Sequence, residues 1–253
     1  MMSLVRSEWT KLRSLRSTWL VVLSTVVAGV ALSVLGSSDF FGDPASSLPG
    51  DWDPTATSLK GFLFAQLLVG MLGALAITNE QDTGTIGTSL AFVPSRARLL
   101  AAKTIVLTAV ALGTALVTTL ASFFAVQLAF DGTGIPAAGL TDPGVVRALL
   151  CATLYLTLVA LAGIAVGVLG RSATASLAVL VGVLLLVPAL GPGLPGRLGG
   201  WFEKYWPITA GQASYDVVHH PGALAPGAGL GILALVVAGT GAAALTALRG
   251  RDV

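Results

Sequence analysis

The sequence has 253 residues, of which 55% are hydrophobic and only 10% are charged. Soluble domains carry about 25% charged residues, so this chain has too few charges to cover a water-facing surface. High hydrophobicity also excludes an intrinsically disordered chain, which is poor in apolar residues. The single cysteine, Cys151, excludes a disulfide framework and a cysteine-based metal site. Composition therefore indicates a polytopic membrane protein.

Six charge-free stretches are long enough to cross a bilayer. A spanning helix needs about 20 mostly apolar residues, because an ionised side chain at the bilayer centre costs roughly 2.5–3.5 kcal/mol. These stretches predict an all-α protein, one transmembrane domain over residues 1–253, with spans over residues 17–36, 61–79, 104–130, 148–170, 172–187 and 228–248. Three prolines, Pro188, Pro192 and Pro195, set the expected end of the fifth span, because proline interrupts a helix.

The charges are divided unevenly between the two ends of these spans. Six spans place both termini on one side, where most of the basic residues fall: Arg6, Lys11, Arg13, Arg16, Arg96, Arg98, Lys103, Arg171, Arg249 and Arg251. The opposite side carries Lys60, Arg147, Arg197, Lys204 and most of the acidic residues. By the positive-inside rule, both termini are predicted to be cytoplasmic. The alternative of a cleaved signal peptide over residues 1–36 is disfavoured, because its apolar run exceeds the usual length of roughly 7–15 residues.

The segment before the first span has an amphipathic pattern. Its apolar residues recur every three or four positions and share one helical face: Val5, Trp9, Leu12, Leu15 and Trp19. The pattern predicts an interfacial helix over residues 3–18, with the two tryptophans at headgroup depth. Glu8 and Arg16 interrupt the apolar face. A plain basic flank that only sets the topology remains the alternative.

The connection between spans two and three is the second cytoplasmic element. Glu80 lies where span two leaves the membrane, and Asp82-Thr83-Gly84 is a turn signal in which Thr83 can cap a short helix. Ile86, Leu90 and Val93 follow at helical spacing, and Pro94 ends the pattern. We therefore predict a short interfacial helix that receives a partner, with an ordinary positively charged loop as the alternative.

These two elements together resemble the ABC-2 type permeases of ATP-binding-cassette transporters. The resemblance rests on Glu8-Trp9-Thr10-Lys11, on Glu80-x-x-x-Gly84-Thr85-Ile86, and on Pro94-Ser95-Arg96 followed by Lys103. It implies a plasma-membrane exporter, bacterial in type, in which two permease copies each dock on a separate ATPase subunit. The residues that it implies for coupling to the ATPase are Trp9, Arg13, Glu80, Asp82, Thr83, Gly84, Thr85, Ile86 and Arg96. Gln81 and Asp82 depart from the aromatic and basic residues usual after the glutamate.

No G-x-x-x-x-G-K-[ST] motif is present, so the chain itself has no phosphate-binding loop. We expect a transport subunit that is not an enzyme, with no cofactor, metal or nucleic acid of its own, and with ATP and Mg on the partner. The predicted spans contain no Asp, Glu, Lys, Arg or His, which disfavours an ion-coupled transporter. A membrane scaffold or sensor with a cytoplasmic regulator-binding face is the alternative function.

Several weaker signals concern the membrane interior and the outer side. Gln66 in span two is a candidate for the translocation path, with an interhelical hydrogen bond as the alternative. The spacings Gly163-x-x-x-Gly167 and Gly227-x-x-x-Gly231 fit close helix packing. Four aromatic residues between Trp201 and Trp206 predict a short helix in the outer interface. His219-His220, with no carboxylate at ligand spacing, is a poor metal site.

Overall fold

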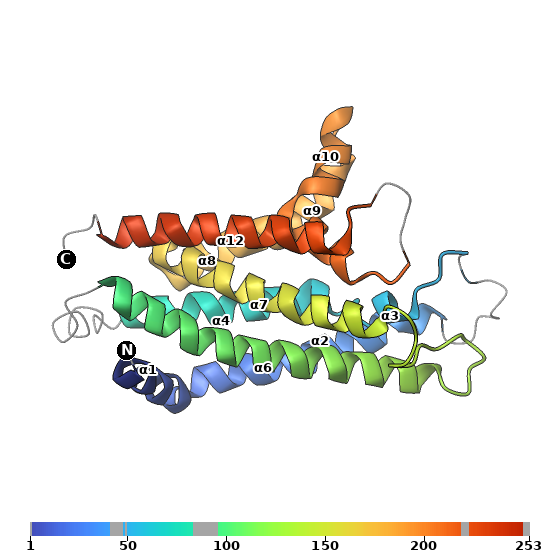
Figure 1. The fold of residues 1–253 in the computed structure, drawn as a ribbon, viewed down its shortest axis with the longest axis horizontal. Coiled ribbons are helices and arrows are strands. Elements are labelled where there is room, and N and C mark those ends of the chain that lie inside the picture. Colours follow the sequence, from blue (N-terminus) through green and yellow to red (C-terminus); the bar gives the residue numbers. More distant parts are fainter. Residues whose placement is uncertain (1, 41–47, 49, 83–95, 219–222, 250–253) are drawn as a thin grey trace.

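Long helices lie side by side in one bundle (Figure 1). The computed structural model describes residues 2–40, 48, 50–82, 96–218 and 223–249, and every regular element among them is a helix. The long helices are α1 (Met2–Ser14), α2 (Arg16–Ser37), α4 (Phe62–Asp82), α6 (Arg96–Phe130), α7 (Val145–Gly170), α8 (Ala173–Val181) and α12 (Pro226–Arg249). The shorter elements are η1 (Ser38–Phe40), α3 (Pro54–Thr57), the π-helical segment η3 (Gly182–Leu186), α9 (Val187–Leu190), η4 (Gly191–Gly193), α10 (Arg197–Tyr205), α11 (Pro207–Gln212) and η5 (Ala213–Tyr215).

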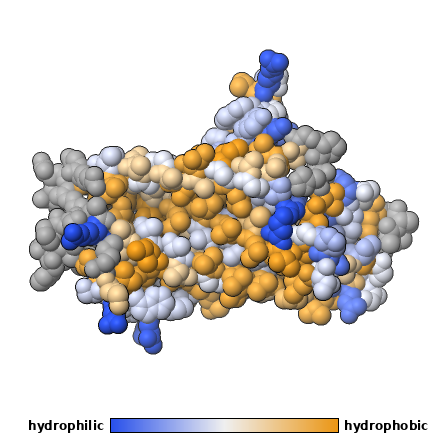
Figure 2. Space-filling view, in the orientation of Figure 1, coloured by the Kyte–Doolittle hydropathy of each residue, from blue (hydrophilic) through white to orange (hydrophobic). Residues whose placement is uncertain are grey.

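Six segments of the described chain are long and apolar enough to cross a membrane, the number that the sequence predicts. They are Arg16–Phe40, Phe62–Glu80, Leu100–Phe130, Val145–Gly170, Ala173–Gly193 and Pro226–Leu248. Apolar residues cover the middle of the bundle, and most hydrophilic residues lie toward its ends and on α10 (Figure 2). The start of α1 and the end of α12 lie at the same end of the bundle, as six spans require (Figure 1). Which end faces the cytoplasm stays a prediction.

Two span boundaries in the structure differ from the predicted ones, because the prediction excludes Glu80 and Lys103 from the spans. The apolar segments run through Glu80 and begin before Lys103, so both charges belong to the ends of spanning helices. A similar difference affects the first helix, which ends at Ser14 and not at residue 18. Leu15 has an extended backbone with φ −81° and ψ 111°, and this break separates α1 from α2.

The fifth span continues beyond Pro188, where the sequence predicts its end. Proline lacks an N–H group, so the carbonyl of Leu184 loses its usual helical partner. Gln66 Nε2 on α4 donates to Leu184 O instead, at 3.1 Å. The backbone shifts to π-helical bonding, with Val187 N–H bonded to Gly182 O, and Trp206 Nε1 donates to the freed Val183 O at 3.1 Å. Neighbouring side chains thus satisfy the backbone, and the apolar segment reaches Gly193.

Close contact between α4 and α7 forms the centre of the bundle. A Cβ atom added to Gly163 or to Gly73 would overlap a backbone carbonyl of the other helix, and one added to Gly167 would lie 2.8 Å from Ala74 O. The predicted Gly163-x-x-x-Gly167 packing motif is therefore confirmed. The Gly227-x-x-x-Gly231 prediction is wrong for contacts within the described chain, because nothing lies within 4 Å of a Cβ at either position.

The aromatic segment near the other end forms α10, which projects sideways from the bundle (Figure 1). Leu198, Trp201 and Tyr205 share one face of α10 and are between 42% and 59% exposed. An apolar exposed face on a helix perpendicular to the spans agrees with the predicted helix in an interface. The His219-His220 pair lies outside the described residues.

The contact between α4 and α7 can be tested with Gly163→Val. The added side chain meets the Gly70 backbone, which cannot move without separating the two helices, so we expect a loss of about 3 kcal/mol or more in stability. Thermal melting of the detergent-purified protein measures the loss. Gly113→Val on α6 is the matched control, because a Cβ there meets nothing within 4 Å; equal melting temperatures for both variants would contradict the packing argument.

Candidate functional site

Four charged side chains meet where α1, α4 and α6 come together. Lys103 Nζ lies 2.7 Å from Glu8 Oε2 and 2.6 Å from Glu80 Oε1. Lys11 Nζ lies 2.8 Å from Glu8 Oε1 and 3.5 Å from Glu80 Oε1. Each lysine therefore contacts both carboxylates, and the four residues, called the charge ring below, close on themselves with no net charge.

Two members of the charge ring, Glu8 and Lys103, are buried, whereas the side chain of Lys11 is 42% exposed. The residue exposures of Glu8 and Lys103 are only 3% and 7%, although glutamate and lysine are almost never buried unless they are paired. Taking a charge out of water is expensive, and removing one member of a buried pair typically costs about 3–5 kcal/mol, because its partner is left uncompensated. Each of the three helices is thus held in place by the charges of the other two.

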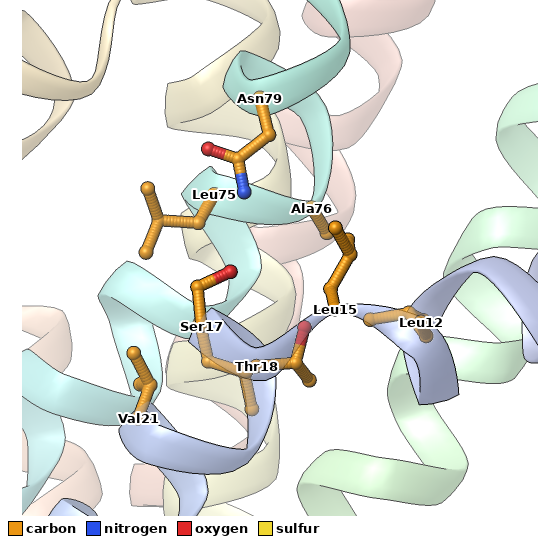
Figure 3. A pocket seen from close by; sticks show the side chains of 9 residues that line it. Leu12, Leu15, Ser17, Thr18, Val21, Leu75, Ala76 and Asn79 are labelled. Carbon is orange, nitrogen blue, oxygen red and sulfur yellow. The ribbon is translucent and has the colours of Figure 1, made fainter.

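Helix α1 presents Glu8 to the ring because of its own spacing. Glu8 and Leu12, four residues apart, form the buried side of α1, and Lys11 is three residues from Glu8. The break at Leu15 ends α1, and the carbonyl of Arg13 in its last turn accepts a hydrogen bond from Trp19 Nε1 at 3.0 Å. Figure 3 shows Leu12 and Leu15 beside Ala76 of α4, and Asn79 and Ser17 lining the same small pocket. The break therefore turns α1 back onto the ends of α4 and α6.

The pKa values of the two ring members on α1 are shifted in opposite directions. Burial alone raises the pKa of Glu8, but hydrogen bonds and charges from Lys103 and Lys11 outweigh burial and hold it below its ordinary value. Burial alone lowers the pKa of Lys11, but its bond to Glu8 and the charges of Glu80 and Glu8 raise it above its ordinary value. Both groups are thus charged at neutral pH.

The structure separates the residues that the resemblance implies for coupling. Glu80 lies in the charge ring, whereas Trp9 is 44% exposed and Arg13 is exposed on α1. Asp82 ends α4 and Arg96 begins α6, so they border the 83–95 connection. The remaining implied residues, Thr83, Gly84, Thr85 and Ile86, lie outside the described residues, as does the predicted helix through Leu90 and Val93.

Sequence reasoning missed three members of the ring as site residues: Glu8, Lys11 and Lys103. The available signal was Glu8 itself, an acid on the apolar face of an amphipathic helix. Such a residue needs a buried cation as partner. The sequence contains no means of choosing which lysine supplies it, because Lys103 is 95 positions away.

Gln66, predicted as a candidate for the translocation path, is fully buried inside the chain. It accepts from Tyr155 Oη and, at 3.4 Å, from Gln212 Nε2, while its own amide donates to Leu184 O. The interhelical hydrogen bond that the sequence offered as the alternative is therefore present. A role in lining a path stays a prediction.

A double-mutant cycle tests the charge ring. Lys103→Met leaves Glu8 buried with only Lys11, so we expect a loss of about 3–5 kcal/mol in thermal stability. In the Glu8→Gln background the same change should cost clearly less, because the buried carboxylate is gone. Additive losses would contradict the proposed coupling, and Lys204→Met at the far end of the bundle serves as the control.

The pKa shifts predict how stability depends on pH. A lowered pKa means that the contribution of Glu8 is present above its ordinary pKa of 4.5 and is lost as the pH falls through its lower folded value. A raised pKa means that the contribution of Lys11 is present below 10.5 and is lost as the pH rises further. We expect the melting temperature of the wild type to decrease as the pH is lowered below about 4.5. The decrease should be less steep in Glu8→Gln and as steep as in the wild type in Asp131→Asn.

Comparison with known proteins adds to this geometry. A search of curated protein sequences finds no significant match. The family model described as ABC-2 family transporter protein matches residues 4–188, which include most of α1, the charge ring and the first four spans. The chain therefore belongs to the ABC-2 transporter family and is a multi-pass membrane component of such a transporter.

Proposed function

We propose that this chain is the permease subunit of an ABC exporter, that two copies form the translocation path, and that each copy couples to a separate ATPase. The contact with the ATPase consists of α1 and the connection that Asp82 and Arg96 border. ATP and Mg bind the partner, because this chain has no phosphate-binding loop. Both termini and the 83–95 connection face the cytoplasm in this proposal, in agreement with the clustering of basic residues there.

The observation that carries the proposal is the charge ring. It joins α1 to the end of α4 and to the beginning of α6, the two helices between which the 83–95 connection runs. A force applied to α1 or to the connection therefore acts on both helices at once. Because α4 contacts α7 through glycines that exclude any side chain, movement of α4 passes directly into the centre of the bundle.

The mechanism follows from these contacts. Closure of the ATPase pair on ATP pushes α1 and the connection, and the charge ring keeps α1, α4 and α6 in register during the movement. The bundles of the two copies then tilt, and the cavity between them switches from inward-facing to outward-facing. The ring is neutral and lies at the ends of the helices, so it carries force without conducting protons through the membrane interior.

The test uses the full chain together with the ATPase that co-purifies with it from native membranes, reconstituted in liposomes. We expect ATP hydrolysis to depend on the permease and to fall at least tenfold in Lys103→Met, because α1 is no longer held on α6. Gly84→Pro and Glu80→Ala should weaken binding of the ATPase itself. Lys204→Gln on α10 is the matched control at the far end, and it should leave hydrolysis unchanged.

Two measurements separate loss of coupling from loss of folding. Melting temperatures of each variant show whether the permease is intact at the assay temperature, and co-purification shows whether the ATPase is bound. Recovery of no nucleotide-binding partner from native membranes, with Glu80→Ala and Gly84→Pro indistinguishable from wild type, would overturn the proposal and favour a membrane scaffold.

A further inference from the structure

Two apolar grooves run along opposite sides of the first turns of α6. One, of about 380 Å³, lies between α1 and α6 and is lined by Val5, Arg6, Trp9, Thr10, Ile105, Val106 and Ala109. The other, of about 450 Å³, lies between α6, α7 and α12 and is lined among others by Ala101, Ile105, Leu161, Ala165, Gly241 and Leu245. Ile105 borders both grooves and is 50% exposed, so it is the ridge between them.

Apart from Arg6, Thr10 and Thr104, the lining of both grooves is apolar, and each threonine hydroxyl bonds to a carbonyl of its own helix. Both grooves lie toward the end of the bundle that holds α1 and the end of α12. Figure 2 shows that apolar residues cover the bundle over α6 and α12 on this face. A surface of this kind at membrane depth is in contact with acyl chains and not with water. Two narrow grooves that share one ridge match the two acyl chains of a single phospholipid.

Two arginines belong to the helix segments that border the grooves. Arg6 lines the groove between α1 and α6. Arg98 is exposed and precedes Ala101 and Ile105 by three and seven positions, so it shares their face of α6 and extends beyond the ridge toward the helix end. In the described part of the chain, neither guanidinium is paired with a carboxylate. Trp9, beside Arg6, is half exposed at the same depth, as expected of an interfacial tryptophan.

We propose that these two grooves bind one anionic phospholipid, with one acyl chain on each side of Ile105 and the phosphate between Arg6 and Arg98. A phospholipid fits better than a second copy of the chain. Two arginines without acidic partners favour an anionic headgroup, whereas in the described residues the grooves offer a protein partner almost no hydrogen-bonding groups.

The lipid has a structural consequence for the charge ring. Helix α1 is one wall of the smaller groove, and α6 is the other, so a bound lipid bridges the same two helices that Glu8 and Lys103 join. An anionic lipid therefore stabilises α1 on the bundle. This inference depends on insertion in a membrane and not on the proposed ATPase, so the two can fail separately.

The test is lipid binding to the full chain purified in detergent. Native mass spectrometry compares retention of phosphatidylglycerol and phosphatidylcholine with identical acyl chains. We expect wild type to prefer phosphatidylglycerol about 25-fold, because each of the two arginines near the headgroup contributes about a fivefold preference. Arg6→Gln and Arg98→Gln should each lower this preference about fivefold. Arg171→Asn, which removes an exposed cation from the α7–α8 turn at the same end, should leave it unchanged.

The grooves themselves are tested by Ile105→Trp, which fills the space on both sides of the ridge and should reduce binding of both lipids about tenfold. Val117→Trp, also exposed on α6 but outside both grooves, is the matched control. Thermal melting without added lipid shows whether each tryptophan variant is folded. Arg6 and Arg98 are exposed, so we expect their glutamine variants to fold as the wild type does. Equal binding of the two lipids by wild type, or an equal effect of Arg171→Asn and Arg98→Gln, would overturn the site. A disulfide between two copies carrying Ile105→Cys in a Cys151→Ala background would assign the ridge to a second copy instead.

Discussion

The buried charges of Glu8 and Lys103 need partners, and this need determines how α1, α4 and α6 are joined at one end of the bundle. Glu8 and Lys103 are both buried, and each is acceptable there only because the other, with Lys11 and Glu80, completes a neutral ring. The ring takes the place of an extensive apolar contact in fixing α1, a helix that buries Leu12 but leaves Trp9 44% exposed. The groove between α1 and α6 depends on α1 being held there.

Other interactions hold the rest of the bundle together. Lipid tails are as apolar as the helices, so the hydrophobic effect does not drive the helices to associate within a membrane. Glycines on α4 and α7 let the backbones touch, and buried amides and hydroxyls supply the specific bonds. Gln66 is the clearest case, because it joins α4 to α7 and also satisfies the carbonyl that Pro188 leaves without a partner. A ring that fixes one end and a close-packed centre together make a body suited to transmitting displacement along its length.

Much of the architecture was predictable because a bilayer imposes simple length and polarity requirements. Charge-free runs identified six spans, and the amphipathic repeat identified α1. The errors have physical causes. The sequence predicts that the second and third spans exclude Glu80 and Lys103, because an isolated charge is unfavourable in the membrane. It predicts that the fifth span ends before Pro188, because an isolated proline ends a helix. In both cases a partner from another helix removes the penalty.

The sequence by itself thus determined the membrane class, the number of candidate spans and the uneven division of charge, since these follow from properties of single segments. It also contained the acid on the apolar face of α1, but not its meaning. Only the tertiary structure decided that Glu8 pairs with Lys103, that Gln66 lies inside the chain, and that two grooves share Ile105. Those facts depend on residues far apart in the chain that meet only when the helices pack, and no local pattern specifies such distances.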